Sequence, residues 1–250
     1  MTDSRSVDAR TGAGVEWTQD SCKEGPMEAG YKQFCPIALA AEILCRRWTV
    51  IILRELVAGS TRFNDLKRGL PTISPTLLAQ RLRELESSGI VRRTRDEAGR
   101  GNEYQLTDAG RDLEGIVFAM GRWGQRWIQS DLQLSQLDAR LLMWDMQRNL
   151  DPRPLPAART VIRFVFPELT AARRSWWLVV DKRGQVELLV TDPGIAPDLC
   201  VTSDLRTLTA IWMGRTTVSK EANRIAFAGD ERVARRMQEW LGLSPFAAAA

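Results

Sequence analysis

The sequence predicts two domains, a mainly α domain over residues 31–130 and an α+β domain over residues 157–250. Apolar residues recur at spacings of three and four through the first region, which is the period of an amphipathic helix. After the stretch "DPRPLP" at Asp151–Pro156, short runs rich in β-branched and aromatic residues replace that period. A chain of 250 residues, 44% of them hydrophobic, is long enough to bury two such cores.

Composition narrows the class of protein. Residues 1–30 are acidic and lack the charged-then-apolar pattern of a secretory leader, so we expect a disordered tail. No apolar run approaches the roughly 20 residues that a membrane span requires. The chain has no histidine, and its four cysteines contain no CxxC pair, which argues against a metal site, a disulfide framework and a Ser–His–Asp triad. We therefore expect a cytoplasmic protein without a metal or cofactor.

Two helices are expected before residue 71. The segment "PIALAAEILCRRWTVIILRELVAGS" carries apolar residues at helical spacing, so one helix is predicted from Pro36 to a stop at Gly59. A second, short helix is predicted over Arg62–Leu70, because Pro71 disfavours helical geometry in the residue before it.

A third helix and a hairpin follow. Ser74 suits the N-cap and Pro75 the first helical position, so a helix is predicted to begin there and to end at Gly89. The runs "IVRRTRD" and "EYQLT", separated by "EAGRGN", predict two strands joined by a Gly-containing turn. A longer helix is expected from Thr107 to Gln129.

Residues 131–156 are expected to form a linker helix and a Pro-rich boundary. Beyond them, "TVIRFVF", "SWWLVVD" and "GQVELLVTD" are predicted strands and "DLRTLTAIWMG" is a predicted helix. A last strand, "RIAFAGD", and a closing helix, "ERVARRMQEWLGL", complete an α+β domain.

The helix that begins at Ser74 has two distinct faces. Its apolar face is predicted to be buried and consists of Leu78, Leu82 and Leu85. The opposite face presents hydroxyl, amide and guanidinium groups, from Thr76, Gln80 and Arg83. These are the groups that read base edges in the major groove, since Gln pairs with adenine and Arg with guanine. A solvated helix face has a similar composition, so this pattern alone leaves both interpretations open.

The order of elements favours the DNA-binding interpretation. A short helix, an amphipathic helix and a basic two-stranded hairpin follow one another in the winged helix-turn-helix fold. Residues 31–129 carry 16 Lys and Arg against 11 Asp and Glu, a balance that permits double-stranded DNA as a partner. The residues expected to contact the DNA backbone are Arg62, Lys67, Ser74 and Arg100.

Three segments, "CPIALAAEILCRRWTVIILREL", "TRFNDLKRGLPTISPTLLAQRLRELESSGIVRR" and "YQLTDAGRDL", closely resemble the HxlR family of winged-helix transcription regulators, relatives of the MarR group. The resemblance covers roughly residues 35–130. It implies that Ser74–Ser88 is the recognition helix, that residues 91–106 form the wing, and that the protein is a homodimer held by the first and last helices of the domain. The apolar stripe from Leu113 to Trp127 agrees with a dimer contact, and an intramolecular core explains it equally well.

The same resemblance directs attention to Cys35. Some members of the family sense oxidants or electrophiles through a cysteine at the start of the domain, where "CPI" stands here. Reactive thiolates are stabilised at helix N-termini. The alternative is a free cysteine that packs as a small hydrophobe.

The second domain is similar to the sterol-carrier-protein-type lipid-binding fold over about Val161–Phe246. The run from Asp204 to Trp212 and the closing "FAGDERVARRMQEWLGLSPF" carry this likeness. It implies an apolar cavity for a fatty-acyl or sterol-like ligand, although large aromatic residues are more often plain core and the domain can equally serve only for stability or dimerisation. The residues expected to line such a cavity are Trp144, Trp176, Trp177, Trp212, Met213 and Trp240.

These observations predict a sequence-specific DNA-binding transcription regulator, a dimeric repressor that responds to an apolar ligand through its C-terminal domain. The alternative is a lipid or acyl-ligand carrier, or an interaction scaffold whose winged helix binds protein rather than DNA. An enzyme is not expected, because the chain lacks histidine, a phosphate-cradling Gly-rich loop and a cluster of metal ligands.

Overall fold

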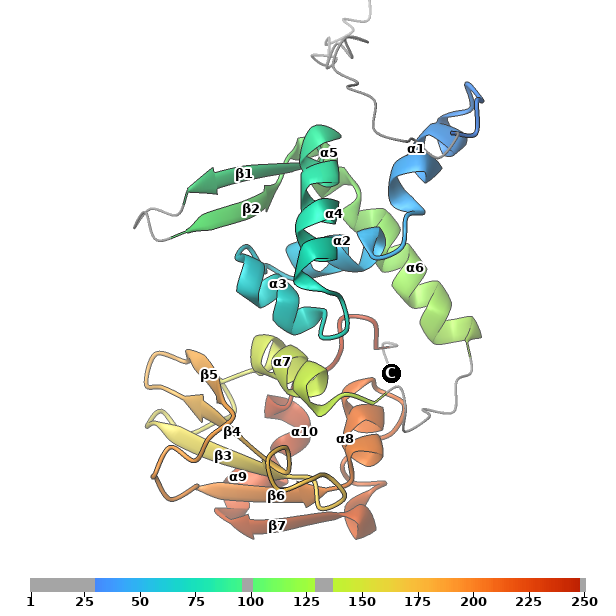
Figure 1. The fold of residues 1–250 in the computed structure, drawn as a ribbon. Coiled ribbons are helices and arrows are strands. Elements are labelled where there is room, and N and C mark those ends of the chain that lie inside the picture. Colours follow the sequence, from blue (N-terminus) through green and yellow to red (C-terminus); the bar gives the residue numbers. More distant parts are fainter. Residues whose placement is uncertain (1–29, 96–100, 129–136, 248–250) are drawn as a thin grey trace, which may run out of the picture. The chain divides into compact units, whose positions relative to one another are not determined.

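The structure is a computed structural model and describes residues 30–95, 101–128 and 137–247 (Figure 1). The chain divides into two compact units, one that ends at Glu42 and one that begins at Ile43. The tail predicted for residues 1–30 lies almost entirely outside the described residues. Within the described ranges, no helix combines the length and the apolar character that crossing a membrane requires.

Two helices stand where the sequence predicts one. Helix α1 spans Pro36–Leu44 and α2 spans Thr49–Val57. Between them, Trp48 has a φ of 80°, a left-handed conformation that cannot continue a right-handed helix. The guanidinium of Arg47 lies 5.4 Å from the centroid of the Trp48 ring. The prediction of a continuous helix is therefore wrong, because apolar spacing on both sides of a turn gives no sign of a left-handed residue between them.

Helices α3 (Phe63–Gly69) and α4 (Pro75–Ser87) agree with the prediction. The Ser74 side chain caps α4, where its Oγ accepts a hydrogen bond of 3.2 Å from the backbone N–H of Leu77. The prediction of a buried apolar face on α4 is confirmed, and the side chains in question are Leu78, Leu82 and Leu85. They pack in one core with apolar residues of α2, α3 and the first strand.

The wing is a two-stranded antiparallel ribbon of β1 (Val91–Arg95) and β2 (Asn102–Leu106), as predicted. Residues 96–100 between them lie outside the described ranges. Strand β2 also meets the chain just before α3, where the backbone N–H of Tyr104 donates to the carbonyl of Thr61 at 2.7 Å. The base of the wing is thus joined to the helix-turn-helix by backbone hydrogen bonds.

A tight corner fixes the wing to the next helix. The hydroxyl of Thr107 donates to the carbonyl of Gly89 at 2.6 Å and accepts from the backbone N–H of Gly110 at 3.1 Å. A Cβ on Gly110 would lie 2.2 Å from the carbonyl oxygen of Ile90, so only glycine permits this approach. This contact explains the glycine in "YQLTDAGRDL".

The helix predicted from Thr107 to Gln129 is divided into α5 (Asp108–Asp112) and α6 (Glu114–Trp127). At the division, the backbone N–H of Leu113 bonds to a carbonyl only three residues earlier, at 3.2 Å, which tightens the turn. The apolar spacing continues across this point, so the sequence pattern alone does not reveal it.

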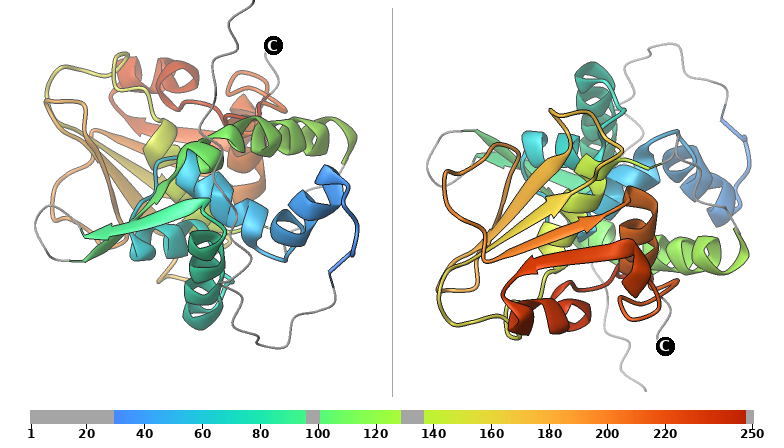
Figure 2. Two further views of the ribbon diagram at one scale, coloured as in Figure 1. Left: turned by 90° about the horizontal axis from the view of Figure 1, so that it is seen from above. Right: turned by 90° about the horizontal axis from the view of Figure 1, so that it is seen from below.

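The C-terminal region contains a five-stranded sheet in the order β5-β4-β3-β6-β7 (Figures 1 and 2). Strands β3 and β6 are parallel, and all other neighbours in this sheet are antiparallel. Strand β6 reads "LCVTS" and was not identified from the sequence, because it is short and mixes polar with apolar residues. The strand bounds are Thr160–Val165 (β3), Ser175–Val180 (β4), Val186–Leu189 (β5), Leu199–Ser203 (β6) and Ile225–Gly229 (β7).

Helices cover one face of this sheet and share its core. Met143 and Met146 of α7, the helix that the sequence assigns to the linker, are fully buried in the same core as Phe164 and Trp240. The prediction of an α+β arrangement after residue 157 is confirmed at the level of a sheet-rich fold with helices. The helix bounds are Ala139–Asn149 (α7), Leu205–Trp212 (α8), Ala222–Arg224 (η3, a 3-10 turn), Glu231–Arg235 (α9) and Met237–Trp240 (α10).

A buried carboxylate joins α2 to α7. The Glu55 side chain is fully buried, and its Oε2 accepts from Arg148 Nη1 at 3.0 Å while its Oε1 accepts from Arg54 Nη2 at 2.6 Å. The Ser60 hydroxyl lies 3.3 Å from Oε2. Arg148 also pairs with Asp145 on its own helix. Because a buried ion is tolerated only when partners replace its water, these groups fix α2 against α7.

The surroundings of this carboxylate are closely packed. A Cβ on Gly69, the last residue of α3, would lie 1.9 Å from Oε2 of Glu55. Nearby, the ring of Trp144 lies beneath the guanidinium groups of Arg68 and Arg148, each 5.4 Å from its centroid. Helices α2 and α3 therefore meet α7 through charged and aromatic groups.

Replacement of Arg148 by methionine is expected to lower the free energy of unfolding by about 3–5 kcal/mol, because it leaves the Glu55 carboxylate buried without its partner from α7. Urea unfolding followed by circular dichroism measures the change. Arg140→Met on the exposed side of α7 is the matched control and should alter stability by less than about 0.5 kcal/mol. Equal losses in the two variants would contradict the role given to the buried pair.

Candidate nucleic-acid interface

Helix α4 presents the three residues predicted to read bases. Thr76, Gln80 and Arg83 are exposed, on the side opposite the buried leucines. Gln80 Nε2 donates to Glu84 Oε1 at 3.0 Å, which orients the amide along the helix. Arg83 has no hydrogen-bond or ion-pair partner among the described residues. Its guanidinium is thus available to an acceptor from another molecule.

Glu84, which sequence reasoning did not single out, organises the rest of this face. Its Oε2 accepts from Arg81 Nη1 at 2.5 Å and lies 3.4 Å from Arg46 Nη1. Burial raises the pKa of the Glu84 carboxyl, but hydrogen bonds from Arg81 and Gln80 and the charges of Arg81 and Arg46 outweigh burial, so the pKa is lowered overall. Arg81 also donates to the carbonyl of Arg47 at 3.1 Å, which ties α4 to the turn before α2. Spacings of three and four along the helix are the signal that identifies such pairs.

The residues predicted to contact phosphates occupy different positions. Ser74 Oγ accepts the cap hydrogen bond, which leaves its O–H as a donor. Lys67 Nζ donates to a backbone carbonyl just after α3 at 2.8 Å. Arg62 Nε lies 3.5 Å from Glu103 Oε1 at the base of the wing. Arg100 lies outside the described residues.

Strand β1 adds arginines that sequence reasoning placed in a basic hairpin without giving each one a role. Arg92 Nη2 donates to Gln105 Oε1 across the ribbon at 3.0 Å. Arg93 and Arg95 are exposed and have no partner within the described part of the chain. These two side chains lie on the same face of the strand, since strand residues alternate between faces.

Helix α6 carries a stripe of exposed apolar side chains. The exposed fraction is 47% for Ile116, 52% for Met120, 60% for Trp123 and 62% for Trp127. These spacings place the four residues on one helical face, whereas Val117, about a quarter of a turn round the helix, is buried. Contiguous exposed apolar surface of this kind is typical of an interaction site.

Cys35 lies immediately before α1 and is partly exposed, with a free thiol. Its carbonyl accepts from the backbone N–H of Leu39 at 3.1 Å, so it occupies the cap position. Cys45 and Cys200 are also free thiols. No group of three or more His, Cys, Asp or Glu side chains that could hold a metal ion occurs in the described ranges.

The residues predicted to line an apolar pocket are distributed over several environments. Trp176 and Trp240 lie in the core between the sheet and its helices. Trp177 lies on the opposite face of the sheet, with the Arg163 guanidinium 5.4 Å from its ring centroid. Trp144 lies at the junction of α3 and α7.

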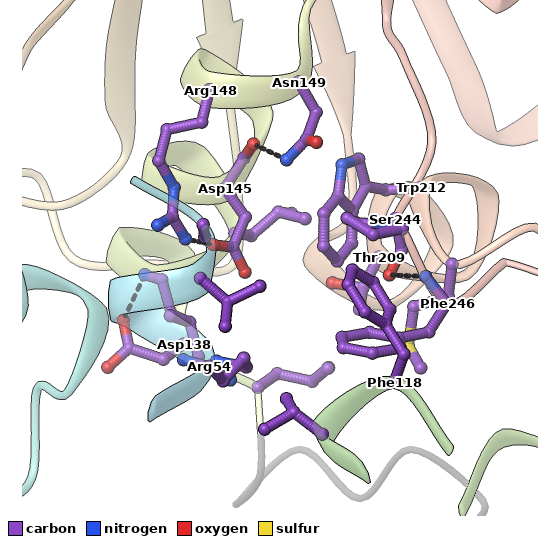
Figure 3. Close-up of a pocket in the computed structure, with 18 of the residues that line it drawn as sticks. Arg54, Phe118, Asp138, Asp145, Arg148, Asn149, Thr209, Trp212, Ser244 and Phe246 are labelled. Atoms are coloured by element: carbon purple, nitrogen blue, oxygen red, sulfur yellow. Dashed lines mark hydrogen bonds and ion pairs between the residues drawn. The ribbon is translucent and has the colours of Figure 1, made fainter. Parts of the chain in front are cut away.

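The other two, Trp212 and Met213, line a cavity of about 460 Å³ (Figure 3). Side chains from α2, α6, α7 and α8 and from residues 244–246 surround this cavity. Asp145 lies on one side of it, across from the rings of Phe118 and Phe246. Sequence reasoning missed these three residues, because the cavity is assembled from segments far apart in the chain.

Comparison with known proteins concerns the first part of the chain. The HxlR-like helix-turn-helix family matches residues 43–132. YvaP of Bacillus subtilis strain 168 is 38% identical over 98 residues, which cover 38% of this chain and 91% of YvaP. YybR of the same strain is 37% identical over 95 residues, which cover 38% of this chain and 76% of YybR. Both are described as uncharacterised HTH-type transcriptional regulators.

Among solved structures, the reduced form of the transcriptional regulator YodB from B. subtilis is 32% identical, with a TM-score of 0.34, and the match covers 39% of this chain and 97% of YodB. The matched family and relatives are regulators of transcription, which confirms the prediction that this chain is not an enzyme.

Proposed function

Because the chain belongs to the HxlR family of helix-turn-helix transcription regulators, we propose that α4 reads a specific sequence in the major groove of double-stranded DNA. Family membership makes the chain a DNA-binding regulator of transcription. The proposal that α4 makes the base contacts rests on the exposed polar face of this helix, which lies opposite its buried leucines. We assign the base contacts to Thr76, Gln80 and Arg83, whose groups match those on base edges.

Contacts to the DNA backbone are proposed for residues around α4 and the wing. Ser74 stands at the N-terminus of α4, where free N–H groups favour an anion. Most protein–DNA hydrogen bonds go to phosphate and sugar, so several basic residues are expected to share this role. They are Arg62, Lys67 and Arg100, together with the exposed Arg93 and Arg95 of β1.

We propose that residues 31–130 form the DNA-binding domain and residues 157–250 a sterol-carrier-type ligand-binding domain, with a tail over 1–30 and a linker over 131–156. The helix-covered sheet and the cavity beside α8 support the ligand-binding role. An apolar ligand would weaken DNA binding, so the protein would act as a repressor that its ligand releases. We place it in the cytoplasm, where its free thiols stay reduced.

A homodimer is proposed on the basis of the exposed stripe on α6. A second copy of the same stripe would cover these side chains by a self-complementary contact. Dimerisation would also place two recognition helices about 34 Å apart, the spacing of successive major grooves.

Arg83→Ala is expected to weaken binding to a duplex selected from a random library by about tenfold or more, and Gln80→Ala to relax the preference at one position. Arg93→Ala should weaken all duplexes alike and reduce the salt slope by about one unit. Fluorescence anisotropy at several salt concentrations measures each effect. Arg206→Ala, on the exposed side of α8, is the control and should change nothing. Unchanged selectivity in both α4 variants would show that the reading face is assigned wrongly, and salt-independent binding would favour a protein partner.

Trp123→Glu is expected to convert the dimer, about twice 28.2 kDa, into a monomer, because it places a charge in the centre of the α6 stripe. Light scattering coupled to size-exclusion chromatography measures the mass. Arg122→Glu, off the stripe but on the same helix, should leave the mass unchanged. A monomeric mass for the unaltered chain would exclude this dimer.

Cys35 is proposed as a sensor of oxidants or electrophiles, supported by its free, partly exposed thiol beside α1. Mild oxidation should then lower the affinity for the selected duplex in the unaltered chain and not in Cys35→Ser. An equal response in the two proteins would rule out this role.

A further inference from the structure

The cavity beside α7 has the size and the wall of a small-molecule site. Its volume of about 460 Å³ lies within the roughly 300–1,000 Å³ of typical ligand pockets. Phe118, Trp212 and Phe246 supply an aromatic wall (Figure 3). The Phe246 ring lies against the bare backbone of Gly121, where a Cβ would come within 2.3 Å of it. The backbone N–H of Ser244 donates to the carbonyl of Trp212 at 2.8 Å, so the last segment is held against α8.

The polar end of the cavity is Asp145. One of its carboxylate oxygens, Oδ1, is bound by Arg148. The other oxygen points into the open space between Asp145 and the rings of Phe118 and Phe246 (Figure 3). Among the described residues no donor reaches this second oxygen. A hydrogen-bond acceptor therefore faces an otherwise largely apolar cavity.

The charges around the cavity favour a cation. Arg54 and Arg148 contribute to the wall, but both direct donors to Glu55, which lies behind it. Two more acids, Glu114 and Asp138, also line the space. Burial raises the pKa of the Asp145 carboxyl in spite of the nearby positive charges of Arg148 and Arg54. A protonated amine supplies both a positive charge and N–H donors.

We propose that this cavity binds an amphipathic amine, whose apolar body lies against Phe118, Trp212 and Phe246 and whose ammonium group binds the free oxygen of Asp145. The proposal gives the ligand response in the proposed function a site and a chemical class, and to that extent it rests on that function. The binding site itself stands on the cavity alone.

The same residues connect the cavity to the DNA-binding helices. Arg148 forms ion pairs with both Asp145 and Glu55. An ammonium group that binds the Asp145 carboxylate would weaken the Asp145–Arg148 pair and so alter how the Arg148 guanidinium binds Glu55. Glu55 belongs to α2 and touches the end of α3 at Gly69. Occupation of the cavity would in this way reposition the helices that precede α4.

Calorimetric titration of the full chain with decylamine, 1-decanol and decanoate tests the site, because the three probes share a chain length and differ in the head group. Decylamine is expected to bind about tenfold or more tightly than the other two. Asp145→Asn, which preserves shape and the acceptor for Arg148, should remove that preference. Asp112→Asn, an exposed carboxylate outside the cavity, should leave it intact. Ala58→Trp, at an exposed position on the rim, should prevent binding of all three.

Equal affinities for the three probes, tighter binding of decanoate, or an amine preference that survives Asp145→Asn would each overturn the proposal. Urea unfolding of Asp145→Asn, performed in parallel, distinguishes a lost contact from a lost fold. Fluorescence anisotropy with the selected duplex measures DNA affinity with and without decylamine, so it tests the coupling to DNA binding separately from the binding site. Decylamine that binds at Asp145 and changes DNA affinity supports both, whereas binding without any effect on DNA affinity supports the site and overturns the coupling.

Discussion

The Glu55 carboxylate is the constraint on which the arrangement of the second compact unit depends. An ion without water must be surrounded by partners, and here they come from α2 itself, from Ser60 and from Arg148 on α7. Gly69 at the end of α3 approaches the same carboxylate so closely that no side chain fits there. The position of the helix-turn-helix is therefore set by α7, and the buried side chains of α7 belong to the core of the C-terminal sheet.

Much of the winged helix could be predicted because its signals are local. Ser74 and Pro75 mark the start of α4, and the leucine spacing marks its buried face. The left-handed Trp48 could not be predicted in this way, since it lies between two segments of unbroken helical spacing. Strand β6 could not be predicted, because a five-residue run with Cys and Thr lacks a clear alternation of apolar and polar residues. Only its pairing with β3 and β7 defines it as a strand.

The candidate site shows the same division between local and distant information. Thr76, Gln80 and Arg83 lie where the helical period places them. The role of Glu84, which accepts hydrogen bonds from Gln80 and Arg81, could not be predicted in the same way, because the period gives the face on which a residue lies and not its hydrogen-bond partners. The ion pair of Glu55 with Arg148 joins residues 93 positions apart, and the local sequence around neither residue predicts it. Composition alone likewise cannot tell core tryptophans such as Trp240 from a wall residue such as Trp212.

The proline-rich stretch after α7 is therefore not a boundary between two independent domains. Exchange of the residues after this stretch for an unrelated domain would keep Arg148 but remove the core in which Met143 and Met146 of α7 are buried, and with it the packing that holds the Arg148 guanidinium at Glu55. A replacement domain would have to cover the same buried face of α7, which limits the exchange of domains at this point in the chain.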